Sequence, residues 1–544
     1  MANSNKLLLA NGNGTLKEKE NVDDIIKLGR YCWLILLFSE LMAFTCLSSM
    51  TVMTYAGYTP KVVGCSNEIF DNDTSICDQL KSRRLQTSCE PILETPFHSV
   101  QVEWDYLCKD AEVVKDSISV QMIGVLIGAA FFGQISDMHG RRFTLIISGL
   151  GNTFTLILTA FAWDLTSFTI IRTITGFFTG GMTVVHSVFL IESIPRKHRM
   201  WIINAFTWSP NFIIFPIVAY YFDDWKSLSL AIAVASGSAT LLIYFLVETP
   251  RFYMQRGQFA DARDVLEKIR KIDGKNTRHY TREAEELICK EQEAQALRSA
   301  KIKRYTFIHL FCTWKLICWT VTLVFGMATA ALITYSLIFN MEQLSGSLYL
   351  NSIIIGIFRW SVNILVAVVD FKFVWFGRKI INLIAVGFSI LALASMSLIY
   401  FIGFKGGSII SIGTVITMAM TSQLFTGKYM AANELYPTAI RNLGISAMST
   451  ASRIGSILAP QLFKLNAYFL SLPYLVLLVL CIIDIISFEM IIPETKSRHL
   501  ENHLPPKEQR LFGKRVPTQM RIADELSLTV EHPLSNEKVV EQAI

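Results

Sequence analysis

The chain has 544 residues, of which 52% are hydrophobic and only 17% are charged, and its mean hydropathy is +0.40. Soluble domains carry about 25% charged residues, so this composition excludes an ordinary soluble protein. The net charge of +6 is not gathered on a basic domain with interleaved aromatic residues, which argues against nucleic-acid binding and favours basic loops on one side of a membrane.

Residues 1–27 are polar and contain one three-leucine run and four acids. This pattern is unlike a cleaved signal peptide. We expect a cytosolic N-terminus, followed by a first helix near 30–53 that itself directs membrane insertion.

Apolar runs of roughly 20 residues recur along the chain, which is the length of a bilayer-spanning helix. They predict an all-α polytopic protein with twelve spans. Basic links follow the second, fourth, eighth and tenth spans, the last of them containing Lys428 and Arg441. The positive-inside rule places these links, the central insert and both termini in the cytosol. The predicted spans lie near 30–53, 117–137, 143–163, 167–190, 200–222, 227–247, 316–339, 350–373, 380–402, 408–427, 444–467 and 472–492.

The loop between the first two spans, 56–116, is then extracellular. It has an acidic excess and a sequon at Asn72, which predicts glycosylation there. An even number of cysteines in an oxidising compartment predicts two disulfides, with three pairings open and free thiols as the alternative. The four cysteines are Cys65, Cys77, Cys89 and Cys108.

The insert after the sixth span contains FADARDVLEKIRKI, with apolar residues at helical spacing, which predicts an amphipathic helix against the membrane face. The C-terminal tail is polar and predicted to be mostly disordered. The predicted regions are a cytosolic N-terminus (1–27), a six-helix bundle (28–248), a cytosolic insert (249–313), a second six-helix bundle (314–492) and a cytosolic tail (493–544).

Several motifs recur in the same order in the two halves. The pattern E-x-x-P-x-x-x-R begins at Glu192 and again at Glu434, in each case after the fourth span of a half. Gly-Arg-Arg ending at Arg142 corresponds to Gly-Arg-Lys ending at Lys379, and Glu248-Thr-Pro corresponds to Pro493-Glu-Thr. Two six-helix halves in parallel repeat predict a transporter with its site between the halves.

These motifs also carry a family resemblance. GQISDMHGRR, ending at Arg142, resembles the signature loop of the major facilitator superfamily, and RTITG, starting at Arg172, resembles its fourth-helix motif. The cysteine-bearing loop, ETPRFYMQRGQFADARDVLEKI, ELYPTAIRNLG and PETK together resemble its organic-ion transporter family, which includes organic cation, organic anion and carnitine carriers. The resemblance implies transport by alternating access. One departure is Val374, which stands where the second signature loop normally has an Asp; the nearest acid is Asp370.

The charges of these loops are predicted to form a cytosolic gate. Carboxylates at helix turns accept hydrogen bonds from guanidinium groups and helix N-termini, and such pairs rearrange readily at a wet interface. Glutamates of the repeated motifs are expected to pair with the arginines that follow them and to act between the halves. The alternative is that the charges only flank helices and orient the chain. The predicted gating residues are Asp137, Arg141, Arg142, Arg172, Glu192, Arg199, Glu248, Arg251, Glu434 and Arg441.

Ionisable residues also lie inside predicted spans. Arg453 and Arg359 each stand about nine residues into spans eleven and eight, and Glu40 is midway in span one. Each buried charge costs at least ~2.5 kcal/mol and therefore needs a partner or a function. The resemblance implies that spans eight and eleven line the cavity, and that anion carriers have Arg where cation carriers have an acid at position 453. We predict a substrate-binding set of Arg453, Arg359, Glu40 and the aromatic Tyr335.

Two arginines at similar depth favour an anionic substrate, because guanidinium groups match carboxylate, sulfate or phosphate. The alternative is that Arg453 forms an ion pair with Glu40, Asp484 or another acid. If Glu40 neutralises one arginine, the site would favour a zwitterion. The leading function is a carrier of small organic anions in the plasma membrane. The alternatives are an organic cation or carnitine-like carrier and a transport-inactive sensor or scaffold.

No Walker, nucleophile-elbow or metal-ligand motif is found, so we expect no enzyme activity, cofactor or metal. The expected partners are a small organic ion and the lipid bilayer, and the expected functional unit is a monomer.

Overall fold

The computed structural model describes residues 28–66, 68–70, 76–86, 89–195, 198, 202, 206, 208–274, 285, 288, 289, 292, 306–373, 375–403, 407–437 and 440–496. Three residues of the sequence predictions, Asn72, Arg199 and Val374, lie outside these ranges, as do both predicted polar tails beyond residues 28 and 496. The predictions made for them stay predictions.

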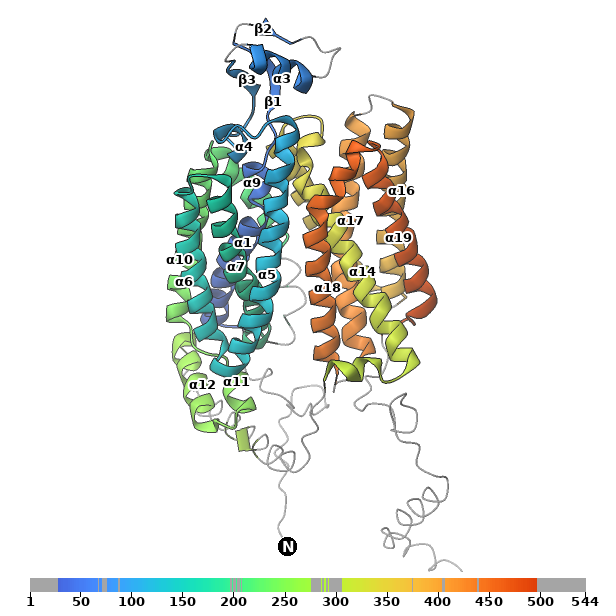
Figure 1. The fold of residues 1–544 in the computed structure, drawn as a ribbon. Coiled ribbons are helices and arrows are strands. Elements are labelled where there is room, and N and C mark those ends of the chain that lie inside the picture. Colours follow the sequence, from blue (N-terminus) through green and yellow to red (C-terminus); the bar gives the residue numbers. More distant parts are fainter. Residues whose placement is uncertain are drawn as a thin grey trace, which may run out of the picture.

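Two helical bundles stand side by side (Figure 1). The N-terminal bundle contains α1 (Arg30–Thr51), α5 (Ala111–His139), α6 (Arg141–Ala160), α7 (Leu165–Ser193), α9 (Asn211–Tyr221) and α10 (Trp225–Phe245). The C-terminal bundle contains α14 (Trp314–Phe339), α15 (Leu348–Lys372), α16 (Arg378–Ile402), α17 (Gly407–Leu435), α18 (Arg441–Leu462) and α19 (Leu472–Ile491).

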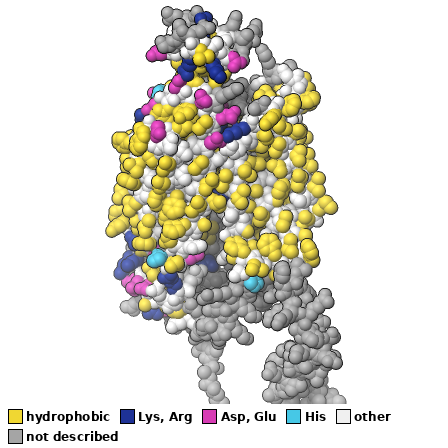
Figure 2. All heavy atoms as spheres, in the orientation of Figure 1, with side chains coloured by type: hydrophobic (Ala, Val, Ile, Leu, Met, Phe, Trp, Pro, Cys, Tyr) yellow, Lys and Arg dark blue, Asp and Glu magenta, His cyan; other side chains and the backbone are white. Residues whose placement is uncertain are grey.

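Ten helices in the described part of the chain are long and apolar enough to span a membrane. Of the remaining two predicted spans, α9 is shorter, and α18 is rich in Ser, Thr and Gly besides Arg453. Figure 2 shows a broad band of hydrophobic side chains across both bundles, with charged side chains gathered toward the two ends. The prediction of an all-α, multi-span membrane protein is confirmed.

Two helix pairs join the two bundles, and in each the second helix of one bundle packs against the fifth helix of the other. α5 packs against α18, and α9 packs against α15. Within each half, small residues let backbones approach closely: a Cβ added to Gly128 of α5 would lie less than 3.0 Å from the carbonyl of Phe177 in α7, and one on Gly455 of α18 would meet Ala328 of α14 equally closely.

A small domain built from the first loop caps one end of the N-terminal bundle, here called the loop end (Figure 1). Its sheet has the order β2-β1-β3, with antiparallel pairs formed by β1 (Lys61–Cys65), β2 (Glu68–Ile69) and β3 (Pro91–Glu94). One disulfide joins Cys65 of β1 to Cys89, just before β3, and a second joins Cys77 of α3 (Ile76–Gln86) to Cys108, just before α5. The structure thus selects one of the three pairings that the sequence left open. The short α2 (Met53–Ala56), α4 (Val100–Glu103) and η2 (Cys108–Asp110) complete this region.

The opposite end, here called the insert end, carries α11 (Pro250–Gln255) and α12 (Phe259–Asp273). The predicted amphipathic helix is α12, but its apolar stripe packs on protein: Val265 and Ile269 share a core with Tyr31 and Ile35 of α1. The C-terminal bundle also has three short 3-10 turns: η5 (Phe307–Phe311), η6 (Met341–Gln343) and η7 (Phe463–Ala467).

Candidate functional site

Side chains from both bundles meet at a junction between the bundles. Arg453 of α18 is half-buried, and its Nη1 lies 3.9 Å from the sulfur of Met50 in α1. The hydroxyl of Tyr335 in α14 lies 3.7 Å from the same sulfur. The structure therefore brings two of the predicted substrate residues, Arg453 and Tyr335, to one point on the facing helix of the other bundle.

Arg359 of α15 is buried, with only 8% of its surface exposed. Its Nη1 donates to the carbonyl of Met418 at 3.3 Å, and its guanidinium lies 4.6 Å from the ring centre of Phe212, which belongs to α9 in the other bundle. Its Nε is buried without a hydrogen-bond partner.

Neither arginine is paired with an acid in the part of the chain that the structure describes. Among the residues that the structure describes, no ion pair contains Arg453 or Arg359. Glu40 is half-buried and accepts a hydrogen bond from Asn211 at 3.0 Å. The carboxylate of Asp484 is occupied by Lys428, so neither acid that was considered as a partner for Arg453 neutralises it.

Lys428 was assigned from sequence to a cytosolic link, and that assignment is wrong. α17 continues to Leu435, and Lys428 is fully buried in it. Its Nζ lies 2.8 Å from the carboxylate of Asp484 in α19 and 3.1 Å from the amide oxygen of Asn382 in α16. A hydropathy window treats a lysine as the end of a span. The sequence signal for a buried pair is Asp484, the acid inside the predicted twelfth span.

A charge cluster closes the insert end of the N-terminal bundle. Arg141 pairs with Asp137 at 3.2 Å and with Glu192 at 3.3 Å. Glu192 also accepts a hydrogen bond from the hydroxyl of Thr249 at 2.7 Å. Glu248 accepts from the first amides of α6, at 2.9 Å from the backbone nitrogen of Arg142. This cluster ties together the ends of α5, α6, α7 and α10.

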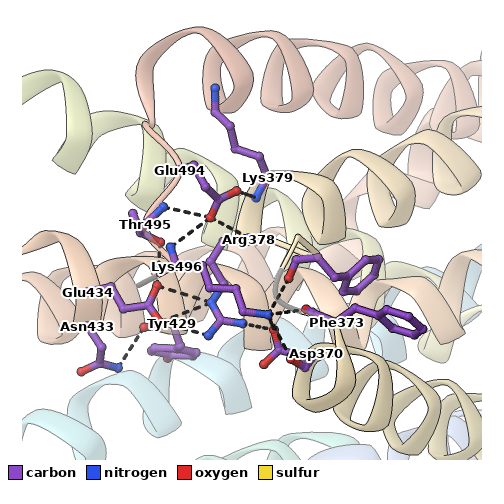
Figure 3. A network of polar contacts seen from close by, with 11 residues as sticks. Asp370, Phe373, Arg378, Lys379, Tyr429, Asn433, Glu434, Glu494, Thr495 and Lys496 are labelled. Atoms are coloured by element: carbon purple, nitrogen blue, oxygen red, sulfur yellow. Dashed lines mark hydrogen bonds and ion pairs between the residues drawn. The ribbon is translucent and has the colours of Figure 1, made fainter. Parts of the chain in front are cut away.

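The C-terminal bundle repeats this cluster (Figure 3). Arg378 pairs with Asp370 at 2.8 Å and with Glu434 at 3.0 Å, and Glu434 accepts from the hydroxyl of Thr495 at 2.7 Å. Glu494 accepts from the first amides of α16, at 2.9 Å from the backbone nitrogen of Arg378. Asp370 supplies the carboxylate that the signature loop would have at position 374, and it also binds Lys496 at 3.0 Å.

The two equivalent glutamates differ electrostatically. Burial raises the pKa of Glu248 above its ordinary value, and amide hydrogen bonds only partly offset this. Burial also acts on Glu494, but the backbone amides of Lys496, Arg378, Lys379 and Thr495 outweigh it, so the pKa of Glu494 is lowered.

These clusters differ from the predicted gate in one respect. The repeated glutamates were expected to pair with the arginines that follow them and to act between the halves. In the described residues, Glu192 and Glu434 instead bind the signature-loop arginines of their own bundle, and Arg441 donates to the carbonyl of Tyr436 at 3.4 Å. The carboxylate of Glu248 binds backbone amides of Arg142 and Thr249.

Arg172, also predicted as a gating residue, lies inside the N-terminal bundle, with 1% of its surface exposed. Its Nη2 donates to the carbonyl of Ser49 at 2.6 Å and to the side-chain oxygen of Gln121 at 3.0 Å. These contacts join α7 to α1 and α5, and they hold α1 in place within the N-terminal bundle.

At the loop end, by contrast, charges join the two bundles. Lys115 of α5 lies 2.7 Å from Glu342 of η6, which also accepts from the backbone of Thr59 at 2.8 Å. The adjacent Asp116 pairs with Lys464 of η7 and accepts from Gln461 at 2.8 Å. We call Lys115, Asp116, Glu342 and Lys464 the loop-end latch. Sequence reasoning missed it, because its members lie at or near the ends of three different predicted spans and share no motif.

The chain can now be compared with known proteins. The pattern of the family described as sugar (and other) transporter matches residues 102–503, which is most of the chain. The chain therefore belongs to this family of membrane transporters, and it does not belong to an enzyme family.

The curated relatives are more specific. The chain is 26% identical to organic cation/carnitine transporter 2 of Mus musculus over 413 residues, covering 73% of this chain and 71% of that protein. It is 27% identical to solute carrier family 22 member 3 of Mus musculus (78% and 76% covered) and 23% identical to solute carrier family 22 member 7 of Sus scrofa (76% and 74% covered). These relatives confirm the resemblance to organic-ion transporters.

Among solved structures, the xylose transporter XylE from E. coli is similar in fold. Its partially occluded inward-open form aligns with a TM-score of 0.59 at 16% identity, covering 86% of this chain and all of that chain. The inward-open form gives the same TM-score, with 86% and 97% covered. These likenesses confirm the major facilitator fold.

The buried pair of the C-terminal bundle gives a stability prediction. Asp484→Ala leaves Lys428 charged and unpaired, which costs about 3–5 kcal/mol in comparable buried pairs. We expect a large loss of cell-surface protein and a lower Tm for the detergent-purified protein. The double variant Lys428→Met with Asp484→Leu removes both charges and is expected to recover most of this loss.

Glu267→Ala is the control for that experiment, because Glu267 is exposed on α12 and pairs only along its own helix, with Lys271. We expect it to change stability by less than about 0.5 kcal/mol. An Asp484→Ala variant as stable as this control would contradict the interpretation.

Proposed function

We propose that this protein carries small organic anions across the plasma membrane by alternating access, with both termini in the cytosol. The observation that carries the proposal is the pair of arginines between the bundles that have no carboxylate partner in the described structure. The names of the relatives, which include organic cation/carnitine transporter 2, support an organic ion as the substrate.

The physical argument is charge balance. An unneutralised guanidinium inside a membrane protein is costly, and a bound anion lowers that cost. Among the described residues, the Arg453 guanidinium donates to the sulfur of Met50, a weak acceptor that leaves most of its hydrogen-bonding capacity open to a ligand. Tyr335 lies beside Met50 together with Arg453, so its ring can contact the organic part of the same molecule.

A second candidate is a zwitterion, favoured by Glu40 and by the carnitine in a relative's name. Glu40 stands ten residues before Met50 on α1, about 15 Å along the helix axis. A ligand that bridges Glu40 and Arg453 must therefore be long, or must move between them during transport.

Uptake measurements test the substrate class. Cells expressing the protein are given radiolabelled hippurate, an aromatic carboxylate, or radiolabelled tetraethylammonium. We expect saturable hippurate uptake that falls at least tenfold in Arg453→Ala, and partial activity in Arg453→Lys, because lysine keeps the charge without the guanidinium fork. Surface biotinylation normalises each value.

Arg84→Ala is the matched control, since Arg84 is on the loop domain and pairs with Asp105. It is expected to leave hippurate uptake unchanged. Hippurate uptake unaffected by Arg453→Ala at normal surface abundance would contradict the proposal, as would uptake of tetraethylammonium alone.

We further propose that the loop-end latch is the extracellular gate, and that the structure is the inward-facing state. In the described residues, ion pairs join the bundles at the loop end, while those at the insert end each stay within one bundle. The clusters around Arg141 and Arg378 would then hold each bundle rigid, and the latch would open and close.

Charge reversal tests this gate. Met50→Cys places a thiol at the substrate junction, where the parent residue is 1% exposed. Adding Lys115→Glu is expected to speed modification of this thiol by an impermeant extracellular thiosulfonate at least threefold, because the latch is broken. The swap Lys115→Glu with Glu342→Lys restores opposite charges and should return the rate toward that of the parent. Equal rates of thiol modification in Met50→Cys alone, in Met50→Cys with Lys115→Glu, and in Met50→Cys with the charge swap would rule out the latch as a gate.

A further inference from the structure

The last residue of α12 meets the first turn of α1. Oδ1 of Asp273 accepts a hydrogen bond from the backbone nitrogen of Tyr31 at 2.8 Å. The carboxyl group also covers Gly29 so closely that a Cβ added to Gly29 would lie less than 3.0 Å from all three carboxyl atoms. Two segments more than 240 positions apart are therefore fitted to each other at atomic distance.

This contact is a helix cap supplied from another helix. The first amides of a helix lack partners, and α1 begins after Gly29, which has no side chain to cap them. An acid at the C-terminal end of a helix is unfavourable for that helix, because the negative pole of its dipole lies there. The carboxylate of Asp273 is therefore unfavourable for α12, but it is favourable for α1 because it lies at the positive end of that helix's dipole.

Apolar contacts hold the two helices in this arrangement. Val265 and Ile269 of α12 pack into the core that contains Tyr31, and the hydroxyl of Tyr31 donates to the carbonyl of Val247 at 3.4 Å. The insert end of α1 is thus fixed by the segment that follows α10. Further along, α1 carries Met50, the residue that Arg453 and Tyr335 contact.

We propose that Asp273 is a positioning residue for transport: by capping α1, it fixes the helix that presents Met50 to the substrate-binding junction. The inference requires that the chain is a transporter, but it does not depend on the charge of the substrate. The proposal gives the cytosolic insert a second role besides linking the two bundles, which is to hold α1 in place.

Hydrogen exchange and transport kinetics test the proposal together. In the purified full-length protein, Asp273→Ala is expected to speed exchange in the peptide 28–36 by about fivefold, the size expected for a lost cap. In cells, KM is expected to rise by a similar factor, while Vmax per surface molecule stays unchanged. The probe is hippurate or, if only the cation is carried, tetraethylammonium. Asp273→Asn keeps the acceptor oxygen and should fall between Asp273→Ala and the parent.

Glu267→Ala, on the exposed face of the same helix, is the matched control and should change neither quantity. Unchanged exchange in Asp273→Ala would show that the cap does not exist in solution. Faster exchange with unchanged KM, or with a loss in Vmax and surface abundance alone, would show a purely structural contact and overturn the positioning role.

Gly29→Ala perturbs the same contact from the other side, because its Cβ must displace the carboxylate. We expect it to raise KM as Asp273→Ala does, and we expect the double variant to be no worse than the more severe single variant. Gly387→Ala, where an added Cβ meets nothing within 4 Å, serves as the glycine control. Fully additive effects of Gly29→Ala and Asp273→Ala would overturn the proposal.

Discussion

The membrane interior makes every buried charge expensive, and the helices of this protein are arranged around that constraint. Lys428 is neutralised by Asp484 and bound by Asn382. Arg172 is held by a carbonyl and an amide oxygen within its own bundle. Arg453 and Arg359 are different, because among the described residues they contact a sulfur, a carbonyl and one aromatic ring. In the described structure, the positive charge that has no carboxylate partner lies where the two bundles meet, which is where the proposed anionic substrate would balance it.

The charges at the two ends of the bundles make different kinds of contact. At the insert end, two equivalent clusters hold helix ends together inside each bundle, and their glutamates cap α6 and α16 through backbone amides. At the loop end, Lys115 and Asp116 reach across to the other bundle. Rigid halves with a rearrangeable contact between them are the mechanical requirement of alternating access. A further contact comes from α12, where Asp273 accepts a hydrogen bond from the first turn of α1, the helix that carries Met50.

Much of this architecture follows from patterns that a single sequence contains. Apolar run lengths predict the spans, the repeated motifs predict two equivalent bundles, and the isolated arginines in spans eight and eleven predict a polar junction. The features that the sequence analysis missed depend on contacts between residues far apart in the chain. A hydropathy window treats Lys428 as the end of a span because it cannot see Asp484 in a neighbouring helix. Val374 reads as a missing acid because Asp370 reaches Arg378 only after the chain turns between α15 and α16. The cysteine pairing and the capping of α1 by Asp273 likewise depend on tertiary contacts that no local pattern encodes.

The central claim is that the uncompensated arginines bind the charged group of the substrate. The most direct measurement is ligand-induced thermal stabilisation of the purified protein by hippurate and by its neutral primary amide, which differ in charge but hardly in shape. The account predicts that hippurate raises the Tm, that the amide does so far less, and that this difference disappears in Arg453→Ala. Equal stabilisation by both compounds, or a difference that survives Arg453→Ala, would contradict it.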